Sequence, residues 1–328
     1  MIKITKINKY LLIPYSKDNN LLNYRLFKIY LYFLFKFVLI LYFFIFSISK
    51  NKLKNRKLPF KFNNKFKKKI LNNNPRLFKL KYKNFIEEIP YYNHTHLISK
   101  KIFWCWLQGQ NNTPIISRVC LNSIFRYCKS NEIHIINEKN INKYVRFPSF
   151  IINKYKNKII SKTHFSDLLR LELLIKYGGT WIDSTVLITK YNDIFFNKDL
   201  FFFQASKPVF YAGSNWFITA EKESPILKTT RDQLYEYWSK NDKVHDYFIF
   251  HFFLKIACEK YDKDYKKIPR YINEKPHLLQ INLFQPFKEN KYKYILNISS
   301  IHKLTRKRTT NITKGLFYHH ILKEFNSI

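Results

Sequence analysis

Residues 163–186 read THFSDLLRLELLIKYGGTWIDSTV, and this stretch decides the fold of the chain. Its apolar residues recur at the spacing of an amphipathic helix, with Thr163 or Ser166 suited to cap the start. The residues that carry this pattern are Leu168, Leu171, Leu174 and Ile175. Gly178 and Gly179 then end the helix, because glycine accepts the left-handed backbone of a helix C-cap.

Acidic and basic side chains sit at both ends of this unit. Asp167 and Arg170 are three residues apart, so they share one helix face. Asp183 follows the glycines by four residues, near the end of a short apolar strand. Ligands of open α/β sheets bind beyond the carboxyl ends of strands, so Asp183 is a candidate ligand-binding residue. A salt bridge and a capped turn explain the same three residues without function, and spacing alone does not separate the two interpretations.

The neighbouring segments predict an α/β fold with a mostly parallel central sheet. Residues 101–108 and 132–137 read as strands, and residues 114–129 between them read as a helix. Strand–helix–strand alternation is typical of parallel sheets. Further patterns predict a helix at 164–177, a strand at 180–188, strands within 200–219, and helices at 225–239 and 244–259.

An apolar segment lies near the N-terminus. Residues 29–49 are apolar except for Lys36, and a dense run of lysines and arginines follows them. That length matches a bilayer core, and the basic flank favours an anionic membrane surface on the cytoplasmic side. A soluble packing helix is the alternative. We therefore predict a membrane-associating segment at 1–50, a basic connector at 51–100 and a folded domain at 101–328.

The chain is strongly basic, with a formal net charge of +37. Residues 1–100 hold 22 Lys and Arg against 3 acids, so much of the excess precedes the predicted domain. Nucleic-acid binding is one interpretation; codon bias is another, since AT-rich codons encode the over-used Lys, Asn, Ile, Phe and Tyr. The 4 cysteines show no C-x-x-C spacing, which argues for reduced thiols in a cytosolic setting.

Glycine and tryptophan cluster in the same short stretches. The chain has only 5 glycines, in WLQG, YGGTWID, YAGSNWF and KGLFY. Four of the 5 tryptophans lie in or beside these stretches: Trp104, Trp106, Trp181 and Trp216. Ordinary turns and core packing explain any one of them, but their co-occurrence favours a shared site.

The motif HFSDLLR…YGGTWIDSTV resembles glycosyltransferases of the DXD-sugar-binding type (family 32-like), most closely the capsular polysaccharide synthesis proteins. The resemblance extends over roughly residues 100–320. It includes WLQG (106–109), GSNWF (213–217), DYFIFHFF (246–253), PHLLQ (276–280) and SIHKLTRK (300–307).

The resemblance implies a GT-A-like nucleotide-binding fold, preceded by the N-terminal apolar helix. It also implies transfer of a sugar from a nucleotide-sugar donor to a saccharide hydroxyl in surface polysaccharide synthesis, with retention of configuration. Asp167 and Arg170 would contact the donor. Asp183 would hold a divalent Mn²⁺ or Mg²⁺ on the donor diphosphate, helped by His302, while Lys303 would neutralise phosphate charge.

The sequence departs from the D-x-D motif at its second acid, where Thr185 stands. One carboxylate and one hydroxyl bind Mg²⁺ or Mn²⁺ more weakly than two carboxylates. The expected metal dependence is therefore reduced or completed by other ligands, and a catalytically inactive homologue is an alternative. Nucleic acid is not an expected partner on this likeness, although a basic nucleic-acid-binding protein is the other alternative.

The remaining candidates follow from the same resemblance. Asp246 is expected to be catalytic or acceptor-binding, beside Asp183. Donor binding is expected of the residues in the matching stretches that have not yet been given a role: Gln108, Ser166, Gly178, Gly179, Trp181, Asn215 and Trp216.

Overall fold

The computed structural model describes residues 83–206, 211–307 and 314–326. The described strands are β1 (Lys101–Cys105), β2 (Glu132–Ile136), β3 (Gly179–Ile182), β4 (Val186–Ile188), β5 (Leu200–Gln204), β6 (Gly213–Ala220) and β7 (Ile301–Lys303). The longer helices are α5 (Ile115–Tyr127), α7 (Ser149–Lys156), α8 (Lys162–Tyr177), α10 (Pro225–Lys240), α11 (Ile249–Lys260), α14 (Glu289–Ile298) and α15 (Phe317–Phe325). Shorter ones are α4 (Lys83–Glu88), η2 (Gln110–Asn112), α6 (Ile141–Tyr144), α9 (Asp193–Phe196), α12 (Asp262–Lys267), η3 (Lys275–His277) and α13 (Leu278–Asn282).

The central sheet has five strands in the order β2-β1-β3-β6-β5. β1 pairs in parallel with both β2 and β3, whereas β6 is antiparallel to β3 and to β5. Only β6 is therefore reversed within this sheet of the described chain, and the predicted mixed α/β fold with a mostly parallel sheet is confirmed. A separate two-stranded sheet pairs β4 with β7 in antiparallel fashion.

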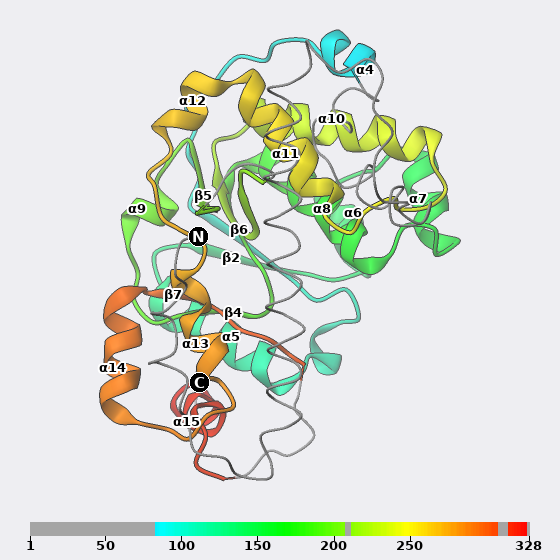
Figure 1. Cartoon of the computed structure of the whole chain (residues 1–328). Helices are drawn as coiled ribbons and strands as arrows, with labels where there is room; N and C mark the ends of the chain where they lie inside the picture. Colours follow the sequence, from blue (N-terminus) through cyan, green and yellow to red (C-terminus); the bar gives the residue numbers. More distant parts are fainter. Residues whose placement is uncertain (1–82, 207–210, 308–313, 327–328) are drawn as a thin grey trace, which may run out of the picture. The chain divides into compact units, whose positions relative to one another are not determined.

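Two groups of helices surround these sheets, as Figure 1 shows. Helix α10 packs on both α8 and α11, and α8 and α11 also contact β6 of the central sheet. Helix α5 contacts β4 and α15, while α13 contacts β7, so these elements surround the two-stranded sheet. Helix α8 belongs to the first group, and strand β7 lies among the helices of the second group.

The helix of the opening stretch begins slightly earlier than predicted. Ser161, rather than Thr163 or Ser166, is the N-cap of α8, and its hydroxyl accepts a hydrogen bond from the amide of His164. Ser166 instead donates a hydrogen bond to the carbonyl of Thr163, 2.7 Å away. Two neighbouring serines and a threonine satisfy the capping pattern equally in sequence, so only the backbone geometry distinguishes them.

The two glycines join α8 to β3. Gly178 and Gly179 have φ values of 65° and 97°, a range that L side chains rarely adopt. A Cβ on Gly179 would lie 2.3 Å from the carbonyl oxygen of Lys101, at the start of β1. The glycines are therefore required both for the backbone turn and for the close approach of two strands.

The strand predicted at 180–188 is broken at Asp183. The amide of Asp183 still donates to the carbonyl of Trp216 in β6, at 2.9 Å. The amide of Val186 then donates to the carbonyl of Asp183, at 3.0 Å, which closes a turn. The chain thus leaves the central sheet as β3 and enters the second sheet as β4, with Asp183 at the joint.

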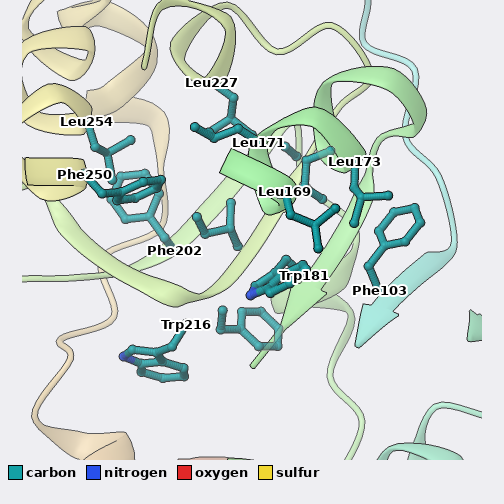
Figure 2. Packing of buried hydrophobic residues seen from close by; sticks show 14 of the residues in the cluster. Phe103, Leu169, Leu171, Leu173, Trp181, Phe202, Trp216, Leu227, Phe250 and Leu254 are labelled. Atoms are coloured by element: carbon teal, nitrogen blue, oxygen red, sulfur yellow. The ribbon is translucent and has the colours of Figure 1, made fainter. Parts of the chain in front are cut away.

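The core lies between the central sheet and the helices α8, α10 and α11. Figure 2 shows leucines of α8 above Trp181 and Phe103 of the sheet, with Phe250 and Leu254 of α11 beside Phe202. The labelled leucines on α8 have no exposed surface, and full burial of one such side chain stabilises the fold by about 1.5–3 kcal/mol. This packing fixes the rotation of α8, and so fixes which of its polar residues reach the sheet.

The N-terminal predictions lie largely outside the described residues. The apolar segment 29–49 is among the residues that the structure does not describe. Within the described ranges, no helix has the length and hydropathy needed to cross a membrane. The described part of the predicted connector packs on the folded chain, since Ile86 and Ile89 are buried. Residues before Lys101 thus pack with the folded chain. The sequence pattern did not predict α4, because a six-residue helix is too short to show a helical period. The division into domains itself stays a prediction.

A cluster around His94 fastens this segment to the rest of the fold. The His94 ring contacts Glu221 through Nδ1 and lies 2.9 Å from Asp264 through Nε2. His96 stacks on it at 5.3 Å and pairs with Asp199. Burial would lower the pKa of His94, but hydrogen bonds to Asp264 and Glu221 outweigh burial and raise it. The charged imidazolium is thus favoured in the folded state.

This contact is expected to make stability depend on pH. A group whose pKa is raised on folding stabilises the fold fully below its unfolded value, about 6.5, and loses that effect as pH rises through the folded value. The difference in melting temperature between the wild type and His94→Gln should therefore be larger at pH 6 than at pH 8.5. Thermal unfolding across that range measures it. A difference that stays constant or grows with pH would contradict the charged state of His94.

Candidate active site

Asp183 lies at the carboxyl end of β3, where the chain turns into β4. Its Oδ1 accepts a hydrogen bond from the indole Nε1 of Trp181 at 2.8 Å. The same oxygen lies 3.4 Å from Nη2 of Arg170, and Oδ2 lies 2.9 Å from Nζ of Lys303. We call Asp183, Thr185, Arg170, Trp181 and Lys303 the Asp183 cluster. The predicted position of Asp183 beyond a strand end is confirmed.

Arg170 reaches the Asp183 cluster from α8. Its guanidinium also lies 2.9 Å from Oδ1 of Asp167, and both side chains are at most 6% exposed. Asn215 of β6 completes this network: its side-chain amide donates to Asp167 at 2.9 Å, and its backbone carbonyl accepts from Arg170 at 2.8 Å. The pair is buried, not the surface salt bridge that the spacing also allowed. Ser166 lies at the edge of the network, with its hydroxyl 3.4 Å from Arg170.

Lys303 reaches the Asp183 cluster from β7, 120 residues along the chain. β7 pairs with β4 so that Lys303 stands opposite Val186. The Nζ of Lys303 then lies 2.9 Å from both Asp183 Oδ2 and the Thr185 hydroxyl. Thr185 is itself held by a hydrogen bond from the amide of Leu304 to its carbonyl. The register of the small sheet therefore determines the position of this ammonium.

The charges around Asp183 keep it ionised. Burial would raise the pKa of Asp183, but the positive charges of Lys303 and Arg170 and the hydrogen bonds from Lys303 and Trp181 lower it overall. The carboxylate is thus a fixed negative charge between two cations, and it aligns both of them. Of these two cationic side chains, Lys303 is 18% exposed and Arg170 is 3% exposed, so Lys303 is the more accessible to a ligand.

Aromatic rings lie beside the Asp183 cluster. The guanidinium of Arg170 lies 5.0 Å from the Trp181 ring centre, and Lys303 Nζ lies 5.9 Å from that of Trp216. Trp216 donates to the side chain of Asn273 at 3.1 Å. Asn273 is a site neighbour that the sequence analysis missed, because a lone asparagine in a loop carries no recognisable pattern.

Further basic charge follows β7. Arg306 lies 5.2 Å from the ring centre of Trp106, just beyond the end of β1. Gln108 is exposed in the same loop, and its backbone carbonyl accepts a hydrogen bond from Asn112. The basic run HKLTRK (302–307) was a usable signal for Arg306, although only His302 and Lys303 were predicted from it.

His302 does not lie with Asp183. Successive residues of a strand point to opposite faces, and Lys303 points to Asp183. The His302 ring is instead fully buried, with Nε2 3.2 Å from the Thr189 hydroxyl. Burial lowers the pKa of His302 to about 3, so the ring is neutral. The predicted metal pair of Asp183 and His302 is therefore not assembled.

Three other candidate residues have roles in the local backbone structure. Asp246 accepts a hydrogen bond from the amide of Phe248 at 2.7 Å, at the start of α11, and it forms no ion pair with the Asp183 cluster in the described structure. Gly178 and Gly179 lie at the amino end of β3, and Asp183 follows Gly179 by four residues, or roughly 13 Å of extended chain. The glycines shape the helix–strand joint at the end of the sheet opposite the Asp183 cluster, because β3 runs away from them.

A separate pocket of the described structure lies away from the Asp183 cluster. A cavity of about 590 Å³ is bordered by segments 190–193, 271–275 and 296–300, and its wall includes Phe203, which stacks on Trp216. No residue of the Asp183 cluster lines it. The convergence of charged groups, rather than cavity size, identifies the candidate site.

The chain is similar to several known proteins. A curated relative, O-glycosyltransferase braB of Annulohypoxylon truncatum, is 27% identical over 173 residues, which are 47% of this chain and 41% of the relative. The match thus spans less than half of that relative's length.

Two solved structures are similar at low identity. PaToxG glycosyltransferase is 16% identical with a TM-score of 0.35, over 71% of this chain and 95% of the other. The apo-form glycosyltransferase GlyE of Streptococcus pneumoniae TIGR4 is 11% identical with a TM-score of 0.40, over 70% of this chain and 61% of the other.

The family match is the broadest of these findings. The family described as capsular polysaccharide synthesis protein matches residues 54–321, which include every element described above from α4 to β7 and the start of α15. The match therefore contains the helix that carries Arg170, the turn that carries Asp183 and the strand that carries Lys303. On this evidence the chain belongs to the capsular polysaccharide synthesis protein family.

Proposed function

We propose that the chain transfers a sugar from a nucleotide-sugar donor to a hydroxyl of a saccharide acceptor, on a GT-A-like fold. The observation that carries this proposal is the convergence of Arg170 and Lys303 on Asp183, at the carboxyl end of β3. Ligands of α/β sheets bind at this edge. The diphosphate of a sugar donor is the anionic ligand that fits both the charge and the family.

Lys303 and Arg170 would act on the departing diphosphate. When the bond between the sugar carbon and the diphosphate oxygen breaks, negative charge grows on that oxygen. Cationic donors that are already oriented stabilise such charge without reorganisation during the reaction. Asp183 contributes by holding both cations in place, and Arg306 beside Trp106 adds positive charge near the same edge.

Asp167 and Asn215 are suited to position the donor. Their side chains hydrogen-bond each other at 2.9 Å, and Arg170 contacts the Asp167 carboxylate and the backbone carbonyl of Asn215. Ser166 and Trp216 border this network and offer a hydroxyl and an aromatic face. A sugar ring presents hydroxyls to polar groups and C–H faces to aromatic rings, which is the mixture found here. Catalysis by Asp246 and a nucleotide contact from Gln108 stay predictions.

Retention of the sugar configuration is part of the proposal and rests on the family likeness. In that reaction the bond between the anomeric carbon and diphosphate breaks, a bond to the acceptor oxygen forms on the same face, and the acceptor proton passes to the diphosphate. The anomeric configuration of the product, measured by proton NMR, tests this step.

The capsular role, the membrane surface and a location on the cytoplasmic face rest on the sequence and the family. The apolar segment 29–49 and the excess of 22 Lys and Arg over 3 acids within residues 1–100 support an anionic membrane partner. Sedimentation of the full chain with vesicles that contain anionic lipid tests this part separately from sugar transfer.

Donor binding is the direct test of the proposed function. Isothermal titration of the full chain with a panel of UDP-, GDP-, ADP- and CMP-sugars is expected to find at least one that binds. Lys303→Met should weaken that binding about tenfold or more, because a charge-assisted hydrogen bond to phosphate is worth roughly 1.5–3 kcal/mol.

Lys266→Met is the matched control, since Lys266 is 73% exposed on α12 and pairs only with its helix neighbour Asp262 in the described structure. It should bind the donor like the wild type. Absence of binding to every donor, together with salt-dependent binding to DNA, would contradict the proposal and favour a nucleic-acid-binding protein. Binding without hydrolysis or transfer would identify a catalytically inactive homologue.

A further inference from the structure

We infer that Lys303 takes the place of the divalent cation between Asp183 and Thr185, so that this chain engages its donor diphosphate without a metal ion. The inference rests on the proposed function and names the group that supplies positive charge at that site. The main observation behind it is the position of the Lys303 ammonium, 2.9 Å from Asp183 Oδ2 and 2.9 Å from the Thr185 hydroxyl.

The ammonium occupies the point where a metal ion on these two residues would lie. A metal held by Asp183 and Thr185 needs an oxygen from each, and Lys303 already contacts those two oxygens. A lysine ammonium has three N–H donors. In the described structure two of them serve Asp183 and Thr185, which leaves one for an oxygen of an incoming diphosphate.

The rest of the donor set does not fit a divalent cation. Asp183 Oδ1 already accepts from Trp181 at 2.8 Å and lies 3.4 Å from Arg170. Thr185 contributes a neutral hydroxyl where Mg²⁺ and Mn²⁺ favour carboxylates. His302 points to the other face of β7. An ion placed here would meet the single carboxylate of Asp183 and the ammonium of Lys303, with Arg170 held between Asp183 and Asp167.

The replacement of an acid by Thr185 then has a physical reason. A carboxylate at position 185 would place two negative charges around the Lys303 ammonium. Its positive charge would then be neutralised and would attract a diphosphate less strongly. A hydroxyl accepts the same hydrogen bond and adds no charge. Thr185 and Lys303 thus work as a matched pair, in which loss of the acid accompanies the built-in cation.

Manganese binding tests this inference without any knowledge of the donor. Free Mn²⁺ gives an electron paramagnetic resonance signal that falls when the ion binds protein. The wild-type chain is expected to bind no Mn²⁺ that depends on Asp183, so wild type and Asp183→Asn should give superimposable titrations. A site in the wild type that Asp183→Asn removes would overturn the inference.

A double variant tests whether the position of the Lys303 ammonium can hold a metal ion. Thr185→Asp with Lys303→Ala restores a second carboxylate and removes the ammonium, so it should gain one Mn²⁺ site per chain that the wild type lacks. Adding Asp183→Asn should abolish the gained site. If the folded double variant gains no such site, then Lys303 does not stand in a cation position and the inference fails.

Two controls keep these outcomes clear. Thermal unfolding and circular dichroism show whether each variant is folded. If the double variant does not fold, the Mn²⁺ titration is made with Lys303→Ala alone, which removes the ammonium and is expected to gain a weaker site. His94, His96 and Glu221 bring potential ligand atoms within 4.8 Å of one another, so a bound ion counts only if Asp183→Asn removes it. Failure to bind any nucleotide sugar would refute the proposed function but would leave these manganese results unchanged.

Discussion

Asp183→Asn is expected to lower the rate of sugar transfer by about two to three orders of magnitude while the protein stays folded. Removing one oriented group that stabilises developing charge typically costs about 10²–10³-fold in rate. Asp183 aligns two such groups, because its carboxylate contacts both Lys303 and Arg170. Asparagine keeps the shape but removes the charge that orients them. The rate is measured with the donor found in the titration panel, by chromatography of the nucleoside diphosphate that is released.

Asp262→Asn is the matched control, because Asp262 is 54% exposed on α12 and pairs with Lys266. It should transfer sugar at the wild-type rate. Near-normal activity of Asp183→Asn would remove Asp183 from the proposed chemistry. Equal loss in both variants would point instead to a general effect of substitution on the preparation.

Gly179→Ala is expected to destabilise the fold by about 2–5 kcal/mol. The added Cβ would lie 2.3 Å from the Lys101 carbonyl oxygen, so the backbones of β1 and β3 must separate. Strain at positive φ costs about 1–2 kcal/mol, and overpacking typically adds about 1–3 kcal/mol. That total is a large share of the roughly 5–15 kcal/mol that stabilises a typical domain. Urea unfolding followed by tryptophan fluorescence gives the change.

Gly109→Ala separates the two contributions. Gly109 has a φ of 87°, but a Cβ there would meet nothing within 4 Å. Only the conformational cost applies, so a loss of about 1–2 kcal/mol is expected. If the two alanine variants lose equal stability, then contact between the strands does not explain the glycine at position 179.

Local patterns predicted much of the central fold. The period of Leu168, Leu171 and Leu174 predicted α8, and the glycine pair predicted its end within a residue. The reversal of β6 was not predicted, because an apolar strand reads the same in either direction. The break of the predicted strand at Asp183 was also missed, since residues 180–188 are apolar on both sides of the turn.

The candidate site divides in the same way. The contact of Asp167 with Arg170 follows from helical spacing, and it was predicted. The contact of Lys303 with Asp183 depends on the pairing of β4 with β7, and no local pattern specifies a register across 120 residues. The choice between His302 and Lys303 depended on that register as well, because a shift of one residue exchanges the two faces of a strand.

The sequence separation between Asp183 and Lys303 has a consequence for protein synthesis. Chains emerge from the ribosome from the N-terminus, and folding proceeds as segments become available. The helix, the glycine joint and Asp183 are all made before β7 exists. A nascent chain that already contains the central sheet therefore lacks the ammonium that completes the Asp183 cluster. On the proposed mechanism, a partly translated chain has no working transferase site, and activity begins only after β7 has emerged and paired with β4.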